Sequence, residues 1–86
     1  LQELISGDVF RRVVHALMRL ANEYGQERQD GVFIAMPMTN QDFANMVGTS
    51  RESINRTLNQ LKKENLLDIN RKGILIYDLE ALKSKQ

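Results

Sequence analysis

Two helix-starting signals stand close together in this chain, at Thr39 and Ser50, with a glycine between them at position 48. A hydroxyl side chain in front of a helix accepts hydrogen bonds from the amides of the first turn, so each residue marks a helix start. The run Thr39-Asn40-Gln41-Asp42 resembles a capping box, with Asp in place of the usual Glu or Gln. Gly48 suits a left-handed backbone, which costs other residues roughly 1–2 kcal/mol. The pattern predicts a short helix, a tight turn and a second helix.

The second helix has a narrow apolar stripe and a wide polar surface. Ile54, Leu58 and Leu61 recur at spacings of four and three, so we expect them to be buried. The residues left facing outward all have hydrogen-bonding side chains: Arg51, Glu52, Ser53, Asn55, Arg56, Asn59 and Gln60. Such a surface is common on solvated helices, but it is also what a helix in a DNA major groove requires. Arginine pairs with guanine O6 and N7, and glutamate accepts from cytosine N4.

The rest of the chain divides into further elements. Apolar spacing in residues 1–6 is helical, and Gly7 is expected to break this pattern before Asp8 caps a helix over 8–24. Residues 26–31 are predicted to be a polar loop, and 32–38 a strand that ends at Pro37.

Two apolar runs, 66–69 and 74–77, flank a turn that ends in glycine, which is typical of a β-hairpin. Asp78 is expected to cap a last helix over 79–83. A hairpin directly after a helix-turn-helix is a wing. The predicted fold is therefore mainly α with a small β wing, an α+β winged helix-turn-helix.

Composition limits the function classes. Eighty-six residues accommodate one small core, without a deep cleft between domains. The net charge of +1 does not by itself favour nucleic acid. Between residues 51 and 72, however, six basic residues face three acidic ones, a local balance of +3. No apolar run approaches the ~20 residues that cross a bilayer, and the absence of cysteine fits a cytoplasmic protein.

Nothing in the sequence forms a catalytic or metal-binding set. His15, the only histidine, shares a polar helix face with arginines, and the acidic residues lack a companion nucleophile. No glycine-rich loop follows a strand. The four methionines are expected to fill the core: Met18, Met36, Met38 and Met46. We expect no enzyme and no cofactor in this part of the chain.

One stretch carries a family resemblance. The DNA-binding signature of the catabolite activator and fumarate–nitrate regulator family closely resembles the run Thr39-Asn40-Gln41-Asp42-Phe43-Ala44-Asn45-Met46-Val47-Gly48-Thr49-Ser50-Arg51-Glu52-Ser53-Ile54-Asn55-Arg56-Thr57-Leu58. The likeness extends over roughly residues 8–80 and includes the wing. The core Val-Gly-x-Ser-Arg-Glu-x-x-x-Arg is its most specific part.

The resemblance implies roles for individual residues. Arg51, Glu52 and Arg56 match the base-reading positions of the catabolite activator branch, which implies a half-site resembling TGTGA. The implied phosphate contacts are Thr39, Gln41, Ser50 and Ser53, and we add Lys72 in the turn of the wing.

Family members are two-fold dimers whose N-terminal domain senses an effector. By this likeness residues 1–7 are the end of a dimerisation helix and a hinge, and 8–86 the DNA-binding domain. The effector is not indicated, and RNA polymerase is a further possible partner, near residues 26–31. The alternative is a winged helix that binds proteins and not specific DNA, which the low net charge favours.

Overall fold

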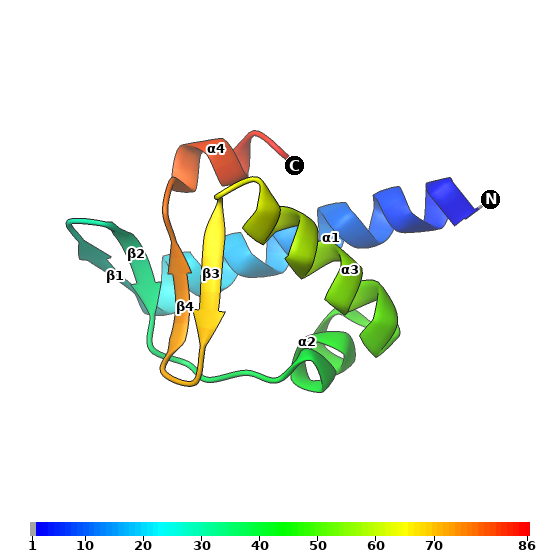
Figure 1. Cartoon of the computed structure of the whole chain (residues 1–86), viewed down its shortest axis with the longest axis horizontal. Helices are drawn as coiled ribbons and strands as arrows, with labels where there is room; N and C mark the ends of the chain where they lie inside the picture. Colours follow the sequence, from blue (N-terminus) through cyan, green and yellow to red (C-terminus); the bar gives the residue numbers. More distant parts are fainter. Residues whose placement is uncertain (1) are drawn as a thin grey trace.

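The computed structural model describes the backbone of residues 2–86 and the side chains from residue 7 onward. Figure 1 shows a long N-terminal helix, shorter helices and a small sheet packed beside it, and a helical turn near the C-terminus. In chain order the elements are α1 (Gln2–Tyr24), β1 (Gly25–Arg28), β2 (Gly31–Ile34), α2 (Asn40–Val47), α3 (Arg51–Lys63), β3 (Leu67–Asn70), β4 (Gly73–Ile76) and α4 (Leu79–Lys83). This confirms the α+β class and the winged helix-turn-helix arrangement predicted from the sequence.

The four strands form one antiparallel sheet in the order β1-β2-β4-β3. The β3–β4 hairpin is the predicted wing, with Asn70 opposite Gly73. Strand β4 also pairs with β2, so that Phe33 lies opposite Leu75. The wing is therefore joined to the chain that precedes α2, which limits its movement relative to the two short helices.

A single core lies between α1, α2, α3 and the sheet. It is centred on side chains with no exposed surface, contributed by every layer: Val13, Val14, Leu17, Ile34, Phe43, Ile54, Leu61, Ile74, Ile76 and Leu82. Leu82 joins it from α4, the helix that Asp78 caps as predicted. Met46 is an exception among the methionines, since 38% of it is exposed, and the prediction that it fills the core is wrong. It lies near the C-terminal end of α2, where it lines a surface groove beside α1.

Helix α1 contradicts the predicted break at Gly7. It runs without interruption through Gly7 and Asp8 to Tyr24. A glycine inside a helix costs only about 0.5–1 kcal/mol, and Val9, two residues after Gly7, is buried in the core. Asp8 caps no helix, and instead its carboxylate pairs with Arg12 one turn later at 3.2 Å. The side chains of residues 1–6, on which the predicted apolar stripe depends, lie outside the described part of the chain.

The predicted loop over 26–31 is also wrong, because this segment forms most of a hairpin. Strand β1 has the sequence Gly-Gln-Glu-Arg, which lacks the alternation of apolar and polar residues typical of a strand, and all four residues are exposed. Backbone pairing with β2 holds it in place, and the Arg28 guanidinium lies over the Phe33 ring, 4.0 Å from its centroid. Strand β2 in turn ends at Ile34, earlier than expected. Within the described residues, no helix is long and apolar enough to cross a membrane.

Substitution of glycine by alanine should have opposite effects on stability at Gly7 and at Gly73. Gly7→Ala should raise the free energy of unfolding by about 0.5–1 kcal/mol, because the added Cβ meets nothing and alanine favours the helix. Gly73→Ala should lower it by at least about 2 kcal/mol, because φ is +151° there and the Cβ would collide with the carbonyl oxygen of Ile34. Urea denaturation measures both values. A destabilised Gly7→Ala protein would mean that α1 requires a break at that position.

Candidate nucleic-acid interface

The turn between α2 and α3 is built as the sequence predicts. Thr39 Oγ1 accepts a hydrogen bond from the Asp42 amide at 3.0 Å, and the Asp42 carboxylate accepts from the Thr39 amide at 2.9 Å, which completes the capping box. At the other end Gly48 adopts the left-handed conformation (φ 81°, ψ 49°), and its amide donates to Ala44 O at 2.8 Å. Both ends of α2 are therefore fixed by local bonds.

The start of α3 is held by serine hydroxyls. Ser50 Oγ accepts from the Ser53 amide at 3.1 Å and lies 3.0 Å from Ser53 Oγ. Arg56 Nη2 donates to Ser53 Oγ at 3.4 Å, so the cap also holds the side chain of Arg56. These three residues thus form one connected group on the first turns of the helix.

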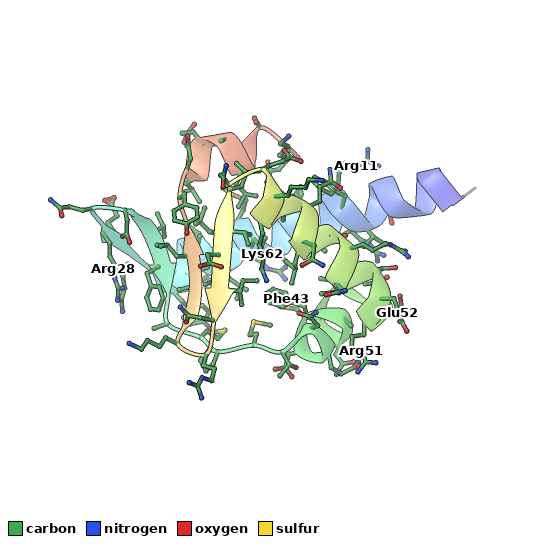
Figure 2. All side chains as sticks on the ribbon, in the orientation of Figure 1. Arg11, Arg28, Phe43, Arg51, Glu52 and Lys62 are labelled. Atoms are coloured by element: carbon green, nitrogen blue, oxygen red, sulfur yellow. The ribbon has the colours of Figure 1, made fainter. Side chains whose placement is uncertain are left out.

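Helix α3 separates a buried side from an exposed one. Ile54, Leu58 and Leu61 are at most 2% exposed, as predicted. Arg51, Glu52 and Arg56 are exposed, and Figure 2 shows Arg51 and Glu52 at the N-terminal end of α3, away from the sheet. At 3.6 residues per turn the three span roughly 140° of the helix circumference. They therefore share the outer surface, although not a single line.

The sequence interpretation did not include Thr57 in the buried stripe. It is 7% exposed, and its hydroxyl donates to Ser53 O at 2.8 Å, which satisfies the polar atom inside the helix turn. Its spacing of three from Ile54 would have placed it on the buried side. The stripe was traced through apolar residues alone, and a threonine is not one of them.

A contact between side chains brings the start of α2 to the outer face of α3. Asn40 Nδ2 donates to Asn55 Oδ1 at 3.2 Å, and Gln41 Nε2 donates to Asn45 Oδ1 at 3.0 Å. Thr39 and Gln41 are both exposed. The start of α2, where two of the predicted phosphate contacts lie, therefore borders the polar surface of α3.

The wing borders the same region. Lys72 is exposed in the β3–β4 turn, where its amide donates to Asn70 Oδ1 at 2.7 Å. A groove of about 380 Å³ separates this turn from the start of α2, with Asn70 and Arg71 on one side and Thr39 on the other. Lys72 is thus the next residue after Arg71, which lines the same groove as Thr39, another predicted phosphate contact.

Two sets of side-chain contacts that hold the ends of α2 and α3 were not predicted. Arg12 Nη1 donates to Val47 O at 3.2 Å, so an α1 guanidinium caps the C-terminal end of α2. At the end of α3, Glu64 accepts from Lys85 and also from Gln60, and these bonds hold the pKa of the Glu64 carboxyl below its usual range. Arg12 and Val47 are 35 residues apart, so no local spacing in the sequence indicates their contact.

Residues 11–85 match the family of the Crp-like helix-turn-helix domain. The "anaerobic regulatory protein" of Bacillus subtilis is 45% identical over 60 residues, which cover 70% of this chain and 25% of that protein. The "CRP-like cAMP-activated global transcriptional regulator" of Mycobacterium tuberculosis is 32% identical over 82 residues, which cover 95% of this chain and 37% of the relative. The chain thus spans only a quarter to about a third of these proteins.

Solved structures show the same fold. Reduced CprK without ligand superimposes with a TM-score of 0.84 at 26% identity, over 92% of this chain and 38% of CprK. The CO-dependent transcription factor CooA from Carboxydothermus hydrogenoformans gives a TM-score of 0.80 at 29% identity, over 95% of this chain and 40% of CooA.

The Ser50 cap can be tested by its effect on stability. Ser50→Ala should lower the free energy of unfolding by about 1 kcal/mol, because the Ser53 amide loses its acceptor. Ser50→Gly should lower the free energy of unfolding by only about a few tenths of a kcal/mol, since water reaches the freed amide more easily. Thermal unfolding of both variants measures the difference. Equal losses would show that the hydroxyl does not cap α3.

Proposed function

Because this chain belongs to the Crp-like helix-turn-helix domain family, we propose that it binds a specific double-stranded DNA sequence with α3 in the major groove. One observation carries the proposal: burial of Ile54, Leu58 and Leu61 leaves Arg51, Glu52 and Arg56 exposed at the start of α3. Helix-turn-helix proteins read base edges with the first turns of this helix. The proposed activity is binding and not catalysis.

We assign the three side chains by their chemistry. Arg51 and Arg56 pair with guanine, and Glu52 accepts from cytosine N4 on the opposite strand. The proposed half-site is TGTGA-like, following the family resemblance of these residues. The hydrogen bond from Arg56 to Ser53 supports a pre-oriented guanidinium, which loses less side-chain freedom when it binds.

Phosphate contacts surround this reading surface. We propose them for Thr39, Gln41, Ser50, Ser53 and Lys72. The positions at the starts of α2 and α3 add the positive ends of two helix dipoles to the hydrogen bonds. Lys72 adds a full charge from the turn of the wing, next to Arg71, which lines the groove that borders Thr39. Together these contacts hold the duplex in register while α3 reads its sequence.

The proposal extends to the whole protein of which this chain represents a part. We propose a homodimer that places two copies of α3 about 34 Å apart on a pseudo-palindromic site, under the control of an effector bound elsewhere. A single domain then makes only half of the contacts, and its affinity falls because the second half-site no longer adds its effective concentration.

Fluorescence anisotropy distinguishes this function from the alternative, a winged helix that binds only proteins, which the net charge of +1 favours. The 86-residue chain is titrated with a duplex that carries TGTGA and with a duplex of the same composition in scrambled order. Tighter binding to the first duplex supports sequence-specific reading. Equal affinity for both at several salt concentrations contradicts it.

Removal of Arg51 should weaken one base contact. Arg51→Ala is expected to cost about 1–3 kcal/mol on the TGTGA duplex and to relax the preference at one base pair, because a bidentate guanine contact is lost. The control is Arg28→Ala, which removes the same charge from the exposed β1–β2 hairpin. Duplexes substituted at each position of the half-site measure the change. A uniform loss on all sequences would assign Arg51 to a phosphate.

Removal of Lys72 should act on all sequences alike. Lys72→Ala is expected to weaken binding uniformly and to reduce the slope of log affinity against log salt by about one, because one counterion fewer is released. Lys83→Ala, an exposed lysine of α4, serves as the control for charge. An unaltered slope in Lys72→Ala would exclude the wing turn from the phosphate contacts.

A further inference from the structure

The exposed side of α1 carries a line of basic residues that the DNA-binding surface does not use. Arg11, His15 and Arg19 are exposed and recur at every fourth position, so they lie one above another at steps of about 6 Å. Within the described part of the chain, no salt bridge involves Arg11 or Arg19. Arg12 stands beside this line and is held by Asp8 and by the carbonyl of Val47.

A groove of about 700 Å³ follows these residues along α1. Apolar side chains line it as well: Ala16, Met18, Met46 and Val47. Met46 is the side chain that was expected in the core and is 38% exposed instead. The groove therefore combines a basic rim with apolar surface, a combination that suits a protein segment with both acidic and apolar side chains.

The charge of this face contrasts with that of the whole chain. Its three arginines and one aspartate give +2 with His15 neutral, whereas the whole chain carries +1, so the remaining residues sum to −1. Positive charge thus gathers on this face of α1, as it also does between residues 51 and 72, where the balance is +3. An acidic partner would be attracted here from a distance and would find the complementary charge at close range.

The position of the groove separates it from the proposed DNA surface. Helix α3 packs against the buried side of α1 and contributes no residue to the groove. Met46 and Val47 line the groove at the C-terminal end of α2, while Thr39 is the N-cap of that helix, about 12 Å from Val47 along its axis. In Figure 2, Arg11 lies on the α1 side of the molecule, away from Arg51 at the start of α3. We therefore expect a duplex bound to α3 to leave this face open.

We propose that this face of α1 is a docking site for an acidic, amphipathic helix of a partner protein. Glutamate or aspartate at every fourth position of a helix repeats at about 6 Å, the same step as Arg11, His15 and Arg19. Apolar residues beside these acids then lie against Met18, Met46 and Val47, as in other helix-in-groove contacts. The proposal does not depend on DNA recognition by α3.

A labelled helical peptide with glutamate at every fourth position and leucine beside it tests the proposal by fluorescence anisotropy at low salt. The control peptide has glutamine in place of glutamate. The protein variant is Arg11→Gln combined with Arg19→Gln, and its matched control is Arg28→Gln, at the β1–β2 hairpin (Figure 2). We expect the acidic peptide to bind, the double variant to bind it about tenfold more weakly, and Arg28→Gln to bind it as the unmodified chain does.

Chemical-shift mapping of the amides then locates the peptide. Shifts at Ala16 and Val47 with the acidic peptide, but not with the glutamine peptide, support the proposal. Equal affinity of the double variant and the unmodified chain would overturn it. The same holds if scrambled duplex DNA moves these amides while the acidic peptide does not, since the face would then bind nucleic acid. Thermal unfolding of the double variant should match that of the unmodified chain, because both arginines are exposed.

Discussion

The burial of one side of α3 determines which polar side chains of this helix are exposed to solvent. Ile54, Leu58 and Leu61 lie in the core that α1, α2 and the sheet enclose. Leaving all three in water would cost several kcal/mol, on the order of 1.5–3 kcal/mol for each side chain. This cost prevents α3 from turning about its axis. The rotation of the helix is thereby set, and with it the set of polar side chains that reaches solvent.

Other contacts convert this rotation into a defined surface. Caps at Thr39 and Ser50 set where α2 and α3 begin, and the Asn40–Asn55 bond joins their exposed sides. Arg12 of α1 holds the C-terminal end of α2 through its hydrogen bond to the Val47 carbonyl. Individually these bonds contribute little, since the net value of a hydrogen bond is about 0.5–1.5 kcal/mol. Together they restrain two short helices that would be only marginally stable alone. By our two proposals, the domain then presents a DNA-reading surface on α3 and a separate basic face on α1.

Much of the fold was predictable because the relevant signals are local. The capping box, Gly48 and the turn before Gly73 each act within a few residues, and the structure confirms all three. The predictions that failed depended on longer range. Gly7 looked like a break, yet α1 continues through it. Strand β1 has four exposed residues and no apolar alternation, so only its pairing with β2 makes it a strand. The reading residues were identified from periodicity and family resemblance, and their roles remain predictions.

The amino-acid sequence by itself determined the order of the elements around the turn and the side of α3 that is exposed. Both follow from hydrogen bonds and apolar spacing within one or two turns of chain. Only the tertiary structure decided what stands beside that surface: Asn40 against Asn55, Arg12 at the end of α2, and Met46 in the groove along α1. These contacts join residues from different helices. Their formation depends on how the helices pack around a shared core, which no local pattern encodes.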